Sequence, residues 1–173
     1  HRGPTPDSMH TMPTLTPVDP TFADSAPNTV VVEKLVAAPP SQVWATITDN
    51  PGWVHWFPTM TSSVNTSEPT TGVGSTRTVK VGGLRAEEQF VAWEPNKLWA
   101  FTITKTNLPM AKRFLEQLEL EAGDGNTTSV RYTGAFEPML ITRPLATIIE
   151  KQISTAWTNG LAGLAAHHEQ LES

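Results

Sequence analysis

The stretch 75–90, STRTVKVGGLRAEEQF, has the alternating pattern of a β-hairpin. Gly82 and Gly83 form its two-residue loop, since both tolerate the positive φ angles of a type I′ turn. Pairing outward from this loop places Arg77 directly opposite Glu88. The face that these two charges share is otherwise apolar and contains Val79, Val81, Leu84, Ala86, Phe90 and Ala92. The hairpin is therefore expected to point two charged side chains into the protein, while Val91 and Trp93 face outward.

An inward-facing ion pair is not an obvious source of stability. Removing one partner of a buried pair costs ~3–5 kcal/mol, whereas replacing both with apolar residues can stabilise the fold. Two interpretations stay open. Arg77 and Glu88 bind the polar group of an otherwise apolar ligand or position a proton donor, or they form a wet, partly exposed pair at a cavity mouth.

The segments on either side of the hairpin predict an α+β fold. Residues 29–36, TVVVEKLV, form a β-branched first strand, and two short helices follow it before Pro58. About six strands are expected between residues 61 and 138, separated by Gly-, Pro- and Asn-rich turns. Residues 143–172 form a long helix with Pro144 near its first turn. The prediction is a curved antiparallel sheet of about seven strands around this C-terminal helix.

Alternation along the later strands selects further residues for a cavity between sheet and helix. Tyr132 is expected to bond a backbone carbonyl or a ligand, and Gly160 to make room for ligand or for close packing. Alternation with Phe114 and Leu118 would place Glu116 inside, but a position in solvent at a strand end is favoured for it. Gly134 would allow the long helix or a ligand to approach the sheet closely. The predicted ligand-contacting residues are Arg77, Val79, Glu88, Phe90, Trp99, Phe101, Ile103, Tyr132, Trp157 and Gly160.

Composition excludes several functional classes. The chain has 173 residues with a net charge of −5, from 12 basic and 17 acidic residues, which argues against a broad nucleic-acid-binding face. It has no cysteine, and the adjacent His167 and His168 point apart on a helix, so no metal site and no cofactor are expected. No apolar run approaches the roughly 18 residues of a membrane span. Residues 1–28, rich in Pro and Thr, are interpreted as a flexible tail, partly an expression remnant, ahead of one domain at 29–173.

The order of elements resembles the helix-grip fold of the START-like superfamily, especially its polyketide cyclase/dehydrase and lipid-transport branch. The resemblance covers residues 29–172. It rests on VAAPPSQVWATITD (36–49), WFP (56–58), GVGS (72–75), EEQFVAWEPNKLWAFTI (87–103) and LELEAGDGNTTSVRYTGAF (118–136). Because this fold hosts many functions, the resemblance implies a fold more strongly than an activity. It also implies a bacterial, cytoplasmic protein. Whether the protein is a monomer or a homodimer stays open at this point.

Two functions follow. The favoured one is binding of a hydrophobic small molecule, such as a lipid, polyketide or isoprenoid, between sheet and helix. The alternative is an enzyme of cyclase or dehydratase type, with Glu88 as base and Arg77 stabilising an enolate. Binding is favoured because Arg77 is expected to hold the pKa of Glu88 low and so weaken it as a base. His55, the other candidate base, lies in the segment of short helices.

Overall fold

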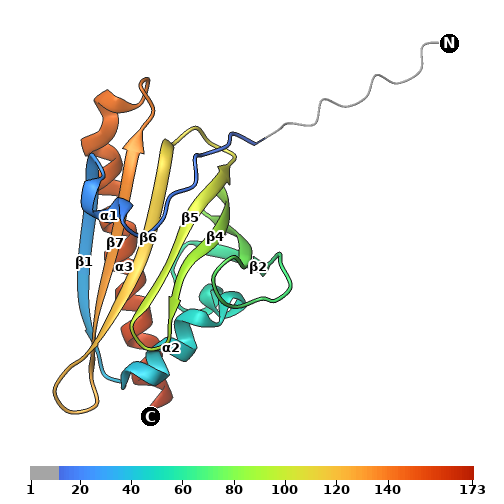
Figure 1. The fold of residues 1–173 in the computed structure, drawn as a ribbon. Coiled ribbons are helices and arrows are strands. Elements are labelled where there is room, and N and C mark those ends of the chain that lie inside the picture. Colours follow the sequence, from blue (N-terminus) through green and yellow to red (C-terminus); the bar gives the residue numbers. More distant parts are fainter. Residues whose placement is uncertain (1–11) are drawn as a thin grey trace.

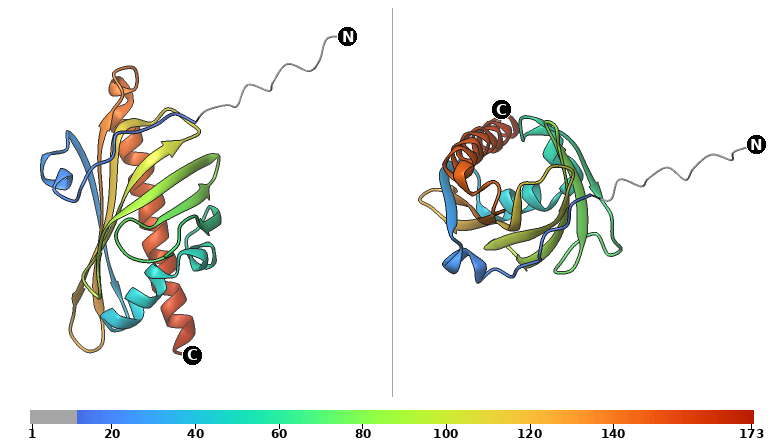
Figure 2. Two further views of the ribbon diagram at one scale, coloured as in Figure 1. Left: turned by 45° about the vertical axis from the view of Figure 1, so that its right-hand side comes forward. Right: turned by 90° about the horizontal axis from the view of Figure 1, so that it is seen from above.

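The computed structural model describes residues 12–173 and confirms the predicted α+β architecture. Seven antiparallel strands form one sheet in the order β1-β7-β6-β5-β4-β3-β2. The strands are β1 (Asn28–Val36), β2 (Met60–Asn65), β3 (Thr76–Val81), β4 (Leu84–Glu94), β5 (Leu98–Thr106), β6 (Ala111–Ala122) and β7 (Thr128–Pro138). The helices are α1 (Phe22–Ser25), α2 (Pro40–Thr48), η1 (Asn50–His55), η2 (Arg143–Leu145) and α3 (Ala146–Leu171). The sheet curves strongly, and α3 runs along its concave side (Figures 1 and 2).

Helix α3 is held close to the segment of short helices by two glycines. A Cβ at Gly160 would collide with the ring of Phe57, and one at Gly163 would collide with the backbone carbonyl oxygen of Trp56. The buried face of the helix also carries Leu161 and Leu164. The glycines thus serve close packing against the loop after η1, and this decides between the two roles considered for Gly160.

The β3–β4 hairpin has the predicted register. Arg77 pairs with Glu88, and the ladder continues to Val81 opposite the first residue of β4. The turn type differs from the prediction, because only Gly82 has a positive φ, of 57°. Positive φ at the first loop residue alone is the pattern of a type II′ turn, which connects the same strand pair with the same register.

A bulge in β4 overturns the predicted orientation of Ala92 and Trp93, whereas Val91 faces outward as predicted. The β4–β5 register shifts between Phe90 and Ala92. As a result Ala92 belongs to the apolar cluster on the outer, convex face of the sheet. Trp93 turns toward the main core instead, where its ring meets that of Trp44 edge-on at 6.0 Å. One extra residue in a strand reverses the alternation that follows it, which the pattern of side chains alone did not reveal.

The N-terminal segment is the second correction. Residues 1–11 lie outside the described residues, so the predicted flexible tail is not tested there. From residue 13 onward, however, the chain crosses the outer face of the sheet as an N-terminal strap (13–25), seen in blue in Figure 1. The amide of Leu15 donates to Thr104 O, and that of Thr16 donates to Lys112 O, at 2.9 and 2.8 Å. The strap therefore fills the gap where β5 and β6 separate.

The strap also covers apolar surface that the sheet alone would expose. The ring of Phe22 is buried on the outer face against Leu115, and the guanidinium of Arg113 lies 4.6 Å from its centre. The remaining members of this outer cluster are small, namely Ala92, Ala100 and Ala135. Their size lets a short helix, α1, lie close to the strands.

Candidate functional site

A cavity of about 270 Å³ lies between the concave face of the sheet and α3. Its walls are largely apolar, and its polar side chains come mainly from β3, β4, β6 and β7. Seven of the ten predicted residues line it, namely Arg77, Val79, Glu88, Phe101, Ile103, Tyr132 and Trp157. Alternation along their strands identified six of them, and the apolar stripe of the C-terminal helix identified Trp157.

Three predicted residues do not line the cavity. Phe90 and Trp99 are fully buried behind it, in an aromatic layer where their ring centres are 5.1 Å apart. Gly160 faces the ring of Phe57 and leaves no space for a ligand. Alternation alone did not separate these side chains from the lining, because all of them point inward and only depth distinguishes them.

The ion pair between Arg77 and Glu88 is buried. The Nη2 atom of Arg77 donates to Glu88 Oε1 at 3.1 Å, and its Nε lies 3.3 Å from both carboxylate oxygens. The two residues are 1% and 2% exposed, which overturns the alternative of a wet pair at the cavity mouth. Arg77 Nη1, in contrast, has no hydrogen-bond partner within residues 12–173.

Aromatic rings surround the guanidinium of Arg77. Its central carbon lies 4.6 Å from the ring centre of Trp53, 5.1 Å from Trp99 and 5.3 Å from Phe101. Ring faces attract cations most strongly when both are removed from water. This aromatic surround therefore stabilises the buried charge and limits the positions that the side chain can take.

A second carboxyl group lies in the same cavity wall. The hydroxyl of Tyr132 donates to Oε1 of Glu116 at 2.6 Å. Glu116 lines the cavity, so the expectation that it lies in solvent is wrong, and so is the backbone carbonyl expected as the partner of Tyr132. The signal for Glu116 was its place between Phe114 and Leu118, both inward-facing residues of the same strand.

Burial changes the acidity of both carboxyl groups. Loss of hydration raises the pKa of Glu116 to about 8, and the charge of Glu88 adds to the rise. Burial also raises the pKa of Glu88, with the charge of Arg77 acting in the opposite direction. The expectation that Arg77 holds the pKa of Glu88 low is therefore wrong, because desolvation outweighs the attraction of the neighbouring charge.

Trp157 forms the helix side of the cavity. Its ring stacks on that of Tyr132 with ring centres 4.2 Å apart and an angle of 15° between the planes. A Cβ at Gly134 would collide with the Trp157 ring, so this glycine allows α3 to approach the sheet, as predicted. Four more residues of α3 line the cavity and were not predicted for the site, although three of them follow the apolar stripe of the helix: Ile149, Gln152, Ile153 and Ala156.

None of the histidines within residues 12–173 lines the cavity that contains these carboxyl groups. His55 is exposed at the end of η1 and does not line the cavity. His168 is buried, and its Nε2 atom lies 3.0 Å from the hydroxyl of Thr46 on α2. Within residues 12–173 no group of three or more His, Asp or Glu side chains is placed to hold a metal ion. In the same range, no helix has the length and apolarity needed to cross a bilayer.

Comparison with known proteins agrees with this geometry. The sequence profile of the family described as polyketide cyclase/dehydrase and lipid transport matches residues 27–169. Uncharacterized proteins of Mycobacterium tuberculosis and Mycobacterium bovis are 28% identical over 131 residues, covering 72% of this chain and 78% of theirs.

Solved structures share the fold at low sequence identity. The Zhui aromatase/cyclase of a Streptomyces species superposes with a TM-score of 0.73 at 17% identity, covering 84% of this chain and 96% of that one. A protein of Thermus thermophilus gives a TM-score of 0.70 at 18% identity, covering 84% of this chain and 100% of its own. At such identities the likeness concerns the fold alone.

Proposed function

Because the chain belongs to the polyketide cyclase/dehydrase and lipid transport family, we propose that its cavity binds a compact, mainly apolar molecule with one oxygen-bearing end. The observation that carries this proposal is the free donor at Nη1 of Arg77, which is buried and belongs to a residue of the cavity wall. A buried donor without a partner costs about 1–3 kcal/mol. A carbonyl, carboxylate or phenolate oxygen of a ligand would satisfy it.

The arrangement of the cavity defines the orientation of such a ligand. Its apolar part would contact Val79, Ile103 and Trp157, where burial contributes roughly 25 cal/mol for each Å² of apolar surface. Its polar end would lie near Arg77 and Glu116. The volume of about 270 Å³ is just below the ~300–1,000 Å³ usual for ligand pockets, which suits a compact ligand.

One observation supports a second function, catalysis by proton transfer. With a pKa of about 8, Glu116 is protonated at neutral pH and can give or take a proton, as a general acid or base requires. Arg77 would stabilise negative charge that develops on a bound enolate oxygen. In this proposal Glu116 takes the role first assigned to Glu88, which is already engaged by Arg77.

The first experiment is native mass spectrometry of the purified protein, followed by denaturing extraction. A co-purified apolar molecule with an oxygen-bearing end would support the proposal. Binding is then measured with the fluorescent probe 8-anilinonaphthalene-1-sulfonate. Ala156→Phe, which fills the cavity from α3, should abolish binding, whereas Ala162→Phe on the exposed side of that helix should not. An empty protein that binds the probe equally well in both variants would refute the proposal.

Binding and catalysis are separated by Glu116→Gln. If the protein is a carrier, this variant changes the affinity only moderately. If it is an enzyme, the variant retains binding of its substrate and loses turnover by about 10²–10⁴-fold, the usual contribution of general acid–base catalysis.

A further inference from the structure

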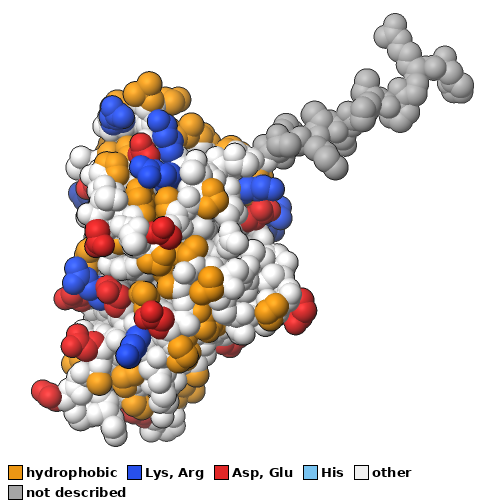
Figure 3. Space-filling model, viewed as in Figure 1, with side chains coloured by type: hydrophobic (Ala, Val, Ile, Leu, Met, Phe, Trp, Pro, Cys, Tyr) orange, Lys and Arg blue, Asp and Glu red, His pale blue; other side chains and the backbone are white. Residues whose placement is uncertain are grey.

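Five large aliphatic side chains are exposed together at one end of the molecule. This apolar tip consists of Leu108, Leu140, Ile141, Leu145 and Ile148. Leu140 and Ile141 are 70% and 78% exposed. The tip accounts for half of the ten large hydrophobic residues that are exposed within residues 12–173. Figure 3 shows apolar side chains gathered at the upper end of the molecule, with basic side chains beside them.

Two connections that are distant in sequence build this tip. The β5–β6 connection carries Leu108, and the segment from β7 to the start of α3 carries the other four. The hydroxyl of Thr142 lies within hydrogen-bonding distance, 3.4 Å, of the carbonyl oxygen of Met110, and Ala111 pairs with Pro138. The two connections that carry the five side chains are therefore neighbours at this end of the molecule.

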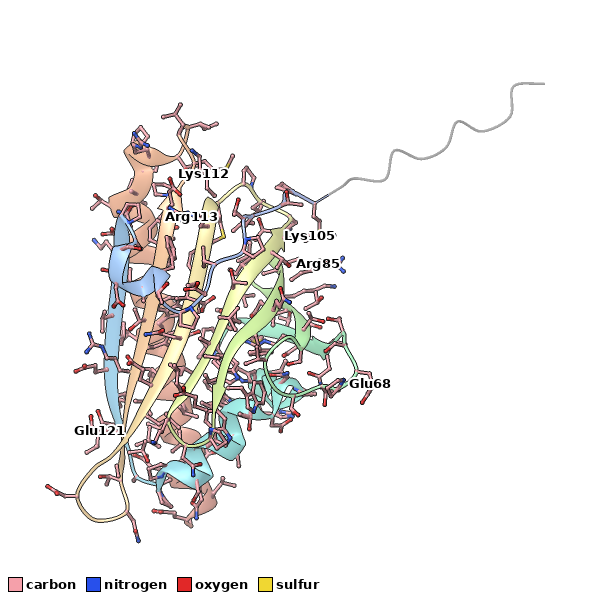
Figure 4. All side chains as sticks on the ribbon, in the orientation of Figure 1. Glu68, Arg85, Lys105, Lys112, Arg113 and Glu121 are labelled. Atoms are coloured by element: carbon pink, nitrogen blue, oxygen red, sulfur yellow. The ribbon has the colours of Figure 1, made fainter. Side chains whose placement is uncertain are left out.

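The charge around the tip differs from that of the whole chain. Residues 107–113 and 137–151 contain four basic and two acidic residues, although acidic residues outnumber basic ones by 17 to 12 overall. Both acidic groups are engaged, because Glu137 pairs with Arg113 at 2.7 Å and Glu150 accepts from Asn28 at 2.7 Å. Within the described part of the chain, no ion pair is made by the three remaining basic residues, Lys112, Arg143 and Lys151. Figure 4 shows Lys112 near the tip and Glu121 at the opposite end of the sheet.

The wall of the cavity reaches this end of the molecule. Met110 and Ile149, next in sequence to residues of the two connections, line the cavity. An outer groove lined by Ile148 and Lys151 shares Gln152 with it. A surface that covers the tip would therefore lie close to these residues of the cavity wall.

We propose that the apolar tip docks onto the surface of a lipid bilayer that contains anionic lipids. Exposed aliphatic patches of this kind mark interaction sites, and a rim of free lysine and arginine matches a negatively charged interface. The excess of basic residues around the tip, in a chain that is acidic overall, favours a negatively charged bilayer as the partner. Docking goes beyond the proposed cavity function and needs no ligand in the cavity.

The test is co-sedimentation of the full chain with vesicles. Vesicles of phosphatidylcholine and phosphatidylglycerol in equal parts are compared with vesicles of phosphatidylcholine alone. Wild type should bind the anionic vesicles, and binding should weaken as salt is raised. The double variant Leu140→Ser, Ile141→Ser should bind about tenfold or more weakly, because it removes side chains that insert into the interface. The matched control Leu35→Ser, Val73→Ser changes two similarly exposed residues away from the tip and should bind like wild type.

Two charge-reversal variants test the role of the basic residues around the tip. Lys112→Glu should reduce binding to the anionic vesicles several-fold, whereas Lys97→Glu in the β4–β5 turn should leave it unchanged. Circular dichroism of each variant confirms that it is folded. Failure of folded wild type to bind anionic vesicles would overturn the proposal. So would equal binding by the tip and control variants, or a stable dimer that only the tip variant dissociates. Because the cavity takes no part in sedimentation, an empty cavity would not affect this result.

Discussion

The two residues of the buried ion pair should not be equally costly to replace: we expect loss of Glu88 to destabilise the protein more than loss of Arg77. Replacing Glu88 by Leu leaves the guanidinium of Arg77 buried and charged, because arginine does not lose its proton in proteins. The three donor–acceptor contacts of 3.1–3.3 Å disappear, and the surrounding rings replace only part of the lost attraction. We expect this variant to lose about 5 kcal/mol of unfolding free energy, the upper end of the range for a broken buried pair.

Replacing Arg77 by Met should cost less, about 3 kcal/mol at neutral pH. Glu88 can become neutral by taking up a proton, and burial already raises its pKa. The loss in this variant should therefore grow as pH rises, when neutrality of the carboxyl group becomes harder to maintain. The double variant, with Met at 77 and Leu at 88, should recover most of the lost stability because no charge remains buried.

Urea denaturation followed by circular dichroism measures these free energies, and a double-mutant cycle isolates the coupling. In thermal melts, 3–5 kcal/mol corresponds to roughly 6–20 °C for a chain of this size. The matched control is the exposed pair between Glu87 and Lys105 at 3.8 Å, whose removal should cost no more than about 1 kcal/mol. Single losses below about 1 kcal/mol at position 88, or a double variant equal to the sum of the singles, would refute the reasoning.

Three further predictions concern other parts of the fold. The raised pKa of Glu116 means that the folded state holds a proton that the unfolded state releases. As pH rises from 4.5 to about 8, the unfolding free energy of wild type should therefore fall relative to that of Glu116→Gln. Unfolding free energies that change in parallel with pH in the two proteins would contradict this. Gly163→Ala should lower the unfolding free energy in urea by about 1–3 kcal/mol, because the added Cβ meets the backbone carbonyl of Trp56. This loss would occur even though Ala normally favours a helix over Gly by ~1 kcal/mol. Asn159→Ala on the same helix serves as the control. Leu15→Ala should lower the unfolding free energy by about 2–4 kcal/mol if the N-terminal strap is part of the core, whereas Val73→Ala at an exposed site should change it by less than about 0.5 kcal/mol.

The pattern of side chains along the sequence correctly predicted features that depend on a short stretch of chain. The glycine pair in the β3–β4 turn and the alternation beside it placed Arg77 opposite Glu88, because side chains on a strand repeat every two residues. The same reasoning reached Tyr132 and Phe101 on the inner face. It stopped at the bulge after Phe90, since an inserted residue changes the alternation without changing the composition of the strand.

The N-terminal strap shows a different limit. Its prolines and threonines lack the periodicity of a helix or strand, which suggested disorder. The strap is ordered because β5 and β6 separate and leave backbone groups that Leu15 and Thr16 can bond. That gap is a property of the paired strands and is invisible in the strap itself.

The sequence by itself determined the order of elements, the hairpin register and the presence of charge on an apolar face, all of which follow from periodicity and turn chemistry. Only the tertiary structure decided how deeply each inward side chain lies. Depth sets the loss of hydration, and hydration controls whether Arg77 and Glu88 are a wet rim or a buried pair and whether Glu116 holds its proton. Such depth arises from the packing of distant segments against each other, so no single stretch of the chain records it.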